Sequence, residues 1–182
     1  MKAAVLYEYN TPLVVEELDL DEPKTGEVLV KTRAAGICRS DLHFMKGEGK
    51  TILPAVLGHE GSGIVERVGE GVASVKPGDR VILSFVPNCG RCHFCTTGRP
   101  NLCDLHAATP GGLFDGTMRL HKGSQRIAHF AKVACFAEQM VVPESGCIPV
   151  SHAVPFEVAA LIGCCVTTGV GAAILNAQVQ PG

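Results

Sequence analysis

The chain contains nine cysteines, and four of them lie within fifteen residues of one another. They follow the pattern C-x2-C-x2-C-x7-C, and they are Cys89, Cys92, Cys95 and Cys103. Two-residue turns let neighbouring thiolates reach one ion, and the longer loop returns the fourth. Four thiolates without an open position are typical of a closed, tetrahedral structural zinc site. The spacing therefore predicts structural zinc in this segment, which we call the cysteine lobe and place at about residues 85–120.

An iron–sulfur cluster is the main alternative for the cysteine lobe, because bacterial ferredoxins also begin with C-x2-C-x2-C. Their fourth cysteine follows after three residues and precedes proline. Here Cys103 follows after seven residues and precedes Asp104. The spacing thus favours zinc, with the cluster and four metal-free buried thiols as the less favoured interpretations.

Three further stretches combine cysteine or histidine with acidic, hydroxyl or glycine residues, namely residues 38–43, 58–60 and 163–165. Taken singly, each is typical of core packing or of a surface pair. Together they offer two cysteines and one histidine. Three such ligands can hold a catalytic zinc ion whose fourth position is left to water or substrate. Spacing alone does not show whether these stretches meet in space.

The elements that must position these residues are mostly short β-strands. Runs rich in Val, Ile and Leu are bounded by Gly, Pro or Asp, which predicts a mainly β domain of the barrel or sandwich class. The predicted strands are residues 2–7, 13–18, 27–34, 63–68, 80–83, 136–142 and 146–148. Residues 84–132 lack a clear period and are expected to leave the sheet. Residues 156–161 and 167–177 have helical spacing, with a glycine-containing interruption at 163–171.

The composition limits the classes of function. The 182 residues are 46% apolar and carry a formal net charge of -2, so they can form one large domain without a basic face for nucleic acid. We expect no membrane helix, because no apolar run approaches about 20 residues, and no signal peptide. An odd number of cysteines without a secretion signal favours metal binding in a reducing compartment over disulfides. The expected location is the cytoplasm.

A family resemblance joins these motifs. Residues 58–72 follow G-H-E-x2-G-x5-G-x2-V, which resembles the zinc signature of the medium-chain, zinc-dependent alcohol dehydrogenases. Residues 38–43 match that family's first-ligand segment, and residues 162–171 look like its third-ligand segment. The cysteine lobe has its structural-zinc spacing. The resemblance implies a GroES-like β-barrel catalytic domain over residues 1–182, with a few short helices and the zinc lobe.

The resemblance also implies roles for individual residues around a catalytic zinc ion. The implied ligands are Cys38, His59 and Cys164, with Glu60 behind the metal as an alternative ligand or an electrostatic partner. Cys165 competes with Cys164 for the ligand position, and the family pattern of Gly followed by Cys favours Cys164. Asp41 would accept a hydrogen bond from His59 and so select its tautomer. A role for Asp41 at a helix start is compatible with this.

The remaining implied roles concern alcohol, cofactor and proton. Ser40 would take the proton of the alcohol and pass it towards His43, which exchanges it with solvent. Arg39 would pair with the pyrophosphate of the cofactor. Phe85 would line the alcohol pocket or serve as an ordinary core residue, and Thr168 would approach the nicotinamide ring. Zinc is a Lewis acid that lowers the pKa of a bound alcohol.

No G-x-G-x-x-G motif occurs in the sequence, and residues 47–51 do not form a P-loop because position 44 is Phe and Ile52-Leu53-Pro54 cannot begin a helix. In the resembling family the nucleotide-binding domain follows this segment directly, so the resemblance implies that it lies beyond Gly182. The chain alone should bind zinc and turn over no alcohol, and the sequence leaves open whether its catalytic site is occupied without the partner domain. Without that domain, residues 156–177 should expose an apolar surface. The intact enzyme should form homo-oligomers, act on a small alcohol or aldehyde, and use NAD or NADP.

Two other classes of function remain open from the sequence. A stand-alone zinc-binding module could serve in protein interaction or in redox sensing, and then Cys38, His59 and Cys164 need not converge. A nucleic-acid zinc ribbon is disfavoured by the net charge. Within the dehydrogenase interpretation, glutathione-linked formaldehyde dehydrogenases and benzyl-type alcohol dehydrogenases share these motifs. Residues 105–132 are where they are expected to differ.

Overall fold

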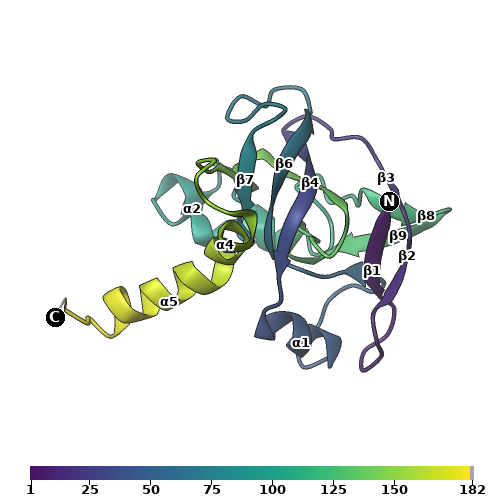
Figure 1. The fold of residues 1–182 in the computed structure, drawn as a ribbon, viewed down its shortest axis with the longest axis horizontal. Coiled ribbons are helices and arrows are strands. Elements are labelled where there is room, and N and C mark those ends of the chain that lie inside the picture. Colours follow the sequence, from purple (N-terminus) through teal and green to yellow (C-terminus); the bar gives the residue numbers. More distant parts are fainter. Residues whose placement is uncertain (181–182) are drawn as a thin grey trace.

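A computed structural model describes residues 1–180, which form two antiparallel-rich sheets that curve around a common core (Figure 1). The five-stranded sheet has the order β10 (Gln139–Pro143), β4 (Glu27–Gly36), β6 (Glu60–Val68), β7 (Arg80–Leu83) and β11 (Cys147–Pro149). The six-stranded sheet has the order β2 (Val14–Glu17), β1 (Lys2–Leu6), β5 (Ala55–Val56), β9 (Gln125–His129), β8 (Leu120–Lys122) and β3 (Asp19–Leu20). Within the second sheet, β5 and β9 are parallel.

The two sheets share one interior, which explains the barrel shape. A bridge between Ala3 and Ala137 links them. Phe136 packs against three of the apolar clusters inside the barrel, so it fills the junction between the sheets. On β4, Val28, Leu29 and Val30 are at most 2% exposed. Both faces of this strand are therefore buried at its start, as expected for a central strand. The prediction of a mainly β, barrel-like domain is confirmed.

Each of the seven predicted strands overlaps an observed one, but residues 84–132 do not simply leave the sheet. Strands β8 and β9 lie in this segment and form a hairpin through Gly123 and Ser124. Gly123 has a φ of 57°, as a tight hairpin turn requires. The polar residues that flank the turn hide the apolar alternation, which is why the sequence did not predict this pair. Strands β3 and β5 are two residues long, too short to leave a periodic signal.

The helices are few and mostly short. Helix α1 (Arg39–Met45) follows β4, whereas α2 (His93–Thr96) and α3 (Asp104–Ala108) lie in the cysteine lobe. Single 3₁₀ turns occur at Pro100–Leu102, Phe130–Lys132 and Glu144–Gly146.

The C-terminal helix is continuous, which corrects the predicted interruption at residues 163–171. Helix α4 (Phe156–Leu161) runs through a π-helical turn at Ile162–Val166 into α5 (Thr167–Gly171), and a second π-helical turn ends at Asn176. A glycine costs a helix only about 1 kcal/mol relative to alanine, so it does not break one. Gly163 has a packing reason, because an added Cβ would lie 2.3 Å from the carbonyl oxygen of Leu83.

This helix projects away from the barrel after its first turns (Figure 1). Ala159 and Ala160 are buried against the sheet, whereas apolar side chains beyond them are exposed, including Val170 and Ile174. The expected apolar surface is therefore present. At 21 residues, Phe156–Asn176 is also long and apolar enough to cross a membrane by length and composition alone, a test that helices of soluble proteins also pass. The expectation that no apolar run approaches this length was wrong, since it treated the glycines as a break.

Candidate metal centres

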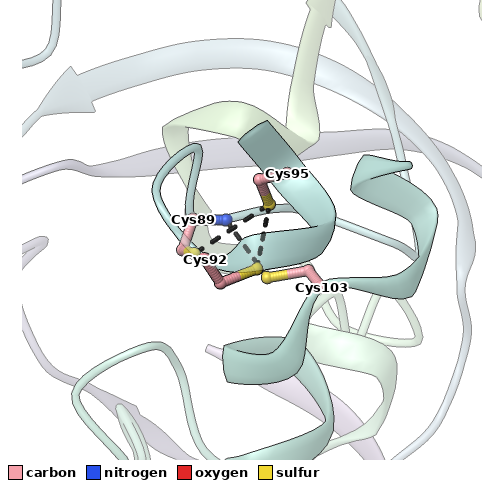
Figure 2. A group of neighbouring side chains, drawn as sticks. All are labelled: Cys89, Cys92, Cys95 and Cys103. Atoms are coloured by element: carbon pink, nitrogen blue, oxygen red, sulfur yellow. Dashed lines mark hydrogen bonds between the residues drawn. The ribbon is translucent and has the colours of Figure 1, made fainter. Parts of the chain in front are cut away.

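The four sulfurs of the cysteine lobe face one another (Figure 2). The Sγ atom of Cys95 lies 3.4 Å from that of Cys92 and 4.0 Å from that of Cys89. Tetrahedral zinc with zinc–sulfur distances of about 2.3 Å places its sulfurs about 3.8 Å apart. The observed separations lie on either side of that value. The lobe therefore has the dimensions of a four-thiolate zinc site.

Local backbone builds this geometry. Cys92 precedes α2 and Cys95 lies within it, while Cys103 is the residue before α3. The backbone N–H of Cys89 donates to the Cys103 sulfur at 3.3 Å. Backbone N–H groups, first that of Arg91, lower the pKa of the Cys89 thiol to about 6. Burial and the neighbouring Cys92 raise the pKa of Cys95 to about 11, so the fourfold cluster of thiols needs a cation to hold all four as thiolates.

The second set of predicted ligands also converges. Cys38, His59, Glu60 and Cys164 each bring one ligand atom into a group whose members all lie within 4.8 Å of one another. His59, Glu60 and Cys164 are 4%, 2% and 8% exposed, and Cys38 is half-buried. These residues come from three separate parts of the chain. We call this group the interior cluster.

Three elements bring the interior cluster together. Cys38 is the residue before α1, and Glu60 begins β6 directly after His59. Cys164 lies in the π-helical turn of the C-terminal helix. Gly163 lets that helix approach β7 closely enough for the Cys164 thiol to reach the other ligands. Cys165 is exposed, and its sulfur contacts the carbonyl oxygen of Leu161 at 3.3 Å. The structure thus places Cys164, and not Cys165, in the group.

Asp41 makes the contacts that both of its considered roles require. One carboxylate oxygen accepts the backbone N–H of Cys38 at 3.1 Å, which caps the start of α1. The other accepts the backbone N–H of Gly58 at 3.1 Å and lies 3.2 Å from Nδ1 of His59. With the Nδ1 proton held by Asp41, the Nε2 lone pair of His59 is free for a metal ion. Asp41 is 1% exposed, so this arrangement is shielded from water.

The charges of the interior cluster fit a divalent cation. Burial, together with Cys38 and Glu60, raises the pKa of the Cys164 thiol to about 12. Burial also raises the pKa of Cys38, but hydrogen bonds from Ser40 and His59 outweigh it and lower the pKa overall. Among the described residues, Oε1 of Glu60 has no hydrogen-bond partner although it is buried. Buried thiol, imidazole and carboxylate groups gathered at one point are the expected donor set of a metal site.

A cavity of about 570 Å³ opens beside the interior cluster. Cys38, His59 and Cys164 form part of its wall, and three phenylalanines, Phe44, Phe85 and Phe130, form much of the rest. The rings of Phe85 and Phe130 each meet the His59 ring edge-on, with centroids 5.6 Å apart. Phe85 therefore lies on the wall of the cavity.

Sequence reasoning missed Phe44, Phe130 and Ala131, which also line the cavity. Phe44 lies on the same helix as Ser40, so helical spacing could have indicated it. Phe130 and Ala131 carry no motif. Ala131 has a φ of 53°, which sequence does not reveal in a residue other than glycine.

The other predicted residues lie on two helices, α1 and the C-terminal helix. Ser40 and Thr168 line it, and Oγ of Ser40 lies 3.8 Å from the Cys38 sulfur. Nε of Arg39 donates to Nε2 of His43 at 3.4 Å, and Nδ1 of His43 pairs with the carboxylate of Glu48. Glu48 was not predicted, because a glutamate in a glycine-rich loop carries no signal of its own. His43 and Glu48 are about half exposed, so this end of the group is open to solvent.

Comparison with known proteins agrees with the fold and the motifs. The family model of the alcohol dehydrogenase GroES-like domain matches residues 24–152. An NDMA-dependent alcohol dehydrogenase of Amycolatopsis methanolica is 44% identical over 182 residues, covering 100% of this chain and 49% of its own length. Alcohol dehydrogenase B of Mycobacterium tuberculosis is 43% identical over 184 residues, with the same coverage. The chain spans about half the length of the curated relatives that it matches.

Solved structures are similar over the same extent. An alcohol dehydrogenase zinc-binding domain protein from Burkholderia ambifaria superposes with a TM-score of 0.91 at 34% identity, over 100% of this chain and 50% of its own. Benzyl alcohol dehydrogenase from Acinetobacter calcoaceticus superposes with a TM-score of 0.89 at 34% identity, over 99% of this chain and 49% of its own. Taken with the barrel and the two cysteine-containing clusters, these matches show that the chain belongs to the alcohol dehydrogenase GroES-like domain family.

Proposed function

We propose that this chain is the catalytic domain of a zinc-dependent alcohol dehydrogenase, which oxidises an alcohol to an aldehyde or ketone, reversibly, and passes hydride to NAD or NADP. The convergence of Cys38, His59 and Cys164 beside a phenylalanine-lined cavity carries this proposal. A stand-alone redox or interaction module gives no reason for three separate segments to meet at such a cavity. The dehydrogenase is therefore the favoured function.

The interior cluster would hold a zinc ion through Cys38, His59 and Cys164, with Glu60 behind them, and the cysteine lobe would hold a second zinc ion. Zinc in the interior cluster supplies Lewis acidity, which lowers the pKa of an alcohol hydroxyl. The three phenylalanines would exclude water and orient an apolar alcohol. This wall favours aromatic or unsaturated primary alcohols, in keeping with the likeness to a benzyl alcohol dehydrogenase.

The chain's own residues offer a path for the alcohol proton. Ser40 lines the cavity beside Cys38 and would accept the hydroxyl proton. His43 is partly exposed, and its pairing with Glu48 would let it exchange the proton with solvent. Arg39 would bind the cofactor's pyrophosphate, and Thr168 would contact the nicotinamide ring.

The cofactor and the remaining partners belong to the same proposal. Because the chain spans half the length of its relatives, we propose that a nucleotide-binding domain outside these 182 residues completes the enzyme and forms most of the contacts in a homo-oligomer. One relative is named an NDMA-dependent alcohol dehydrogenase. Activity assays of the complete enzyme should therefore compare NDMA with NAD and NADP as the electron acceptor. A cytoplasmic location belongs to the same proposal, because clustered cysteines that hold metal are typical of reducing compartments.

Metal stoichiometry provides the test. Elemental analysis of the purified 182-residue chain should find two zinc ions. Cys164→Ala should bind one, and the matched Cys165→Ala should still bind two. One zinc ion in all three proteins would show that the interior cluster does not hold the metal in this chain. NAD-dependent alcohol oxidation by the 182 residues alone would contradict the need for a further domain.

A further inference from the structure

A second, smaller pocket lies behind the aromatic wall of the cavity. Its volume is about 220 Å³, and its polar lining consists of Lys50, Thr51, His106, His129 and Lys132. We call it the histidine–lysine pocket. It shares Phe44, Phe130 and Ala131 with the larger cavity. Pockets that enclose a whole ligand usually measure about 300–1,000 Å³, so this one suits a small terminal group.

His129 contributes a hydrogen-bond donor without an acceptor. It is 1% exposed, and its Nε2 accepts the backbone N–H groups of Arg119 at 2.9 Å and Leu120 at 3.3 Å. Because Nε2 is the acceptor, the ring proton lies on Nδ1. That Nδ1 is buried and has no partner among the described residues. A buried N–H without an acceptor is costly, and in native proteins it usually points to a water molecule, an ion or a ligand.

Lys132 adds a buried positive charge. It is 3% exposed, and its ammonium donates to the carbonyl oxygens of Thr109 at 2.6 Å and Gly112 at 3.0 Å. An ammonium has three N–H groups, so one is left for another acceptor. Burial lowers the pKa of Lys132 to about 8, and its electrostatic interaction with Cys103 in the cysteine lobe partly opposes this shift.

The other polar groups around this pocket are donors or neutral. Nδ1 of His106 is buried and has no partner among residues 1–180, and burial together with the charge of Lys132 lowers its pKa. Lys50 stands at the rim, with its ammonium 4.8 Å from the ring centroid of Tyr9. Within the described residues 1–180, no Asp or Glu lines this pocket. The pocket therefore combines positive charge and unpaired nitrogen atoms without a negative group.

We propose that the histidine–lysine pocket binds a carboxylate group. A carboxylate offers only acceptors, so it can satisfy the N–H of His129 and the free N–H of Lys132 together. A single buried ammonium balances a single negative charge, which favours a carboxylate over a phosphate dianion. The carboxylate belongs either to a small free acid or to the far end of an acid-bearing alcohol whose hydroxyl lies in the neighbouring cavity. Only the second source rests on the proposed function.

Titration of the zinc-loaded 182-residue chain with sodium acetate tests the binding itself. Nitrogen-15 NMR of the histidine rings should show a saturable shift at Nδ1 of His129. Lys132→Met should weaken acetate binding by about tenfold or more, because a charge-assisted hydrogen bond is lost. His106→Gln should weaken it as well, and it keeps the test valid if Lys132→Met does not fold. Lys76→Met, which removes an exposed lysine outside the pocket, should bind acetate like the unchanged chain.

The result that overturns the proposal is equally direct. Acetate that leaves the His129 ring unshifted would mean that water alone satisfies the pocket, and equal shifts in all four proteins would place the anion elsewhere.

The source of the carboxylate follows from a second titration with para-hydroxymethylbenzoate and benzyl alcohol. Tighter binding of the hydroxy acid than of acetate or benzyl alcohol assigns the site to a substrate, whereas equal binding of the two acids assigns it to free carboxylates. Neither readout needs alcohol turnover, so failure here leaves the zinc test of the proposed function untouched.

Discussion

The cysteine lobe and the interior cluster present similar ligand chemistry in opposite ways. The lobe gathers its four thiols from fifteen consecutive residues, and three of the four are only half-buried. The interior cluster gathers its ligands from three distant segments, and His59, Glu60 and Cys164 are nearly inaccessible to solvent. A local site needs only short turns, whereas a distant one needs the whole barrel in place. The lobe should therefore govern stability, and the interior cluster should govern chemistry.

Loss of a lobe ligand should have the largest effect on stability. Cys103 is the most buried of the four and precedes α3. In Cys103→Ser we expect the lobe zinc to be lost and the free energy of unfolding to fall by about 4 kcal/mol, a melting temperature lower by about 8–16 °C. Calorimetry with metal analysis measures both. Cys165→Ser, an exposed cysteine outside either group, serves as control. An unchanged melting temperature in Cys103→Ser would contradict the structural role of the lobe.

Removal of the charge on Asp41 should weaken zinc binding at the interior cluster and leave zinc binding at the cysteine lobe unchanged. In Asp41→Asn the amide cannot accept from Cys38, Gly58 and His59 at once, so the His59 ring is no longer held in its tautomer. Zinc affinity of the interior cluster should fall about 10–100-fold, while the lobe keeps its metal. Competition with a zinc chelator gives both affinities.

Glu157→Gln is the matched control for this variant, since Glu157 is an exposed acid in the first turn of α4 and belongs to neither ligand group. Equal weakening of both zinc sites in Asp41→Asn would show that the substitution acts through general unfolding.

A backbone substitution should test whether close helix packing builds the interior cluster. In Gly163→Ala the new methyl group would lie 2.3 Å from the Leu83 carbonyl oxygen, so the helix must shift and carry Cys164 with it. We expect a loss of about 1–3 kcal/mol of stability, with weaker zinc binding at the interior cluster. Gly171→Ala has no atom within 4 Å of its added Cβ, and should instead stabilise the helix by up to about 1 kcal/mol. Urea denaturation distinguishes them, and similar behaviour of the two variants would refute the packing argument.

Acid should release the two zinc ions in a defined order. Protons compete with zinc for thiolates, so zinc affinity falls as pH falls. Backbone N–H groups lower the pKa of Cys89 to about 6, whereas burial raises that of Cys164 to about 12. Cys95 in the lobe also has a pKa raised to about 11, so we expect the difference to be small. The interior cluster should lose zinc at a slightly higher pH than the lobe in a chelator-coupled pH titration. Release of zinc from the cysteine lobe at a higher pH than from the interior cluster would contradict this prediction.

The sequence determined the features that depend on neighbouring residues. The spacing of the lobe cysteines, the seven main strands and the family motifs follow from short-range pattern, because turns and strand alternation are encoded locally. The hairpin of β8 and β9 was missed where polar residues mask the alternation. The continuous C-terminal helix was missed because its glycines were interpreted as a break. Gly163 is instead required by the close contact between this helix and β7.

Tertiary structure alone decided which distant side chains meet. It brought Cys164 to Cys38 and His59 and left Cys165 outside this group, and it gave Asp41 three partners at once. It also placed Phe130 beside His59, and it buried His129 and Lys132 around a pocket that no sequence motif predicts. The physical reason is that these contacts join residues far apart in the chain. Their geometry depends on how the two sheets and the C-terminal helix pack, which no local spacing specifies.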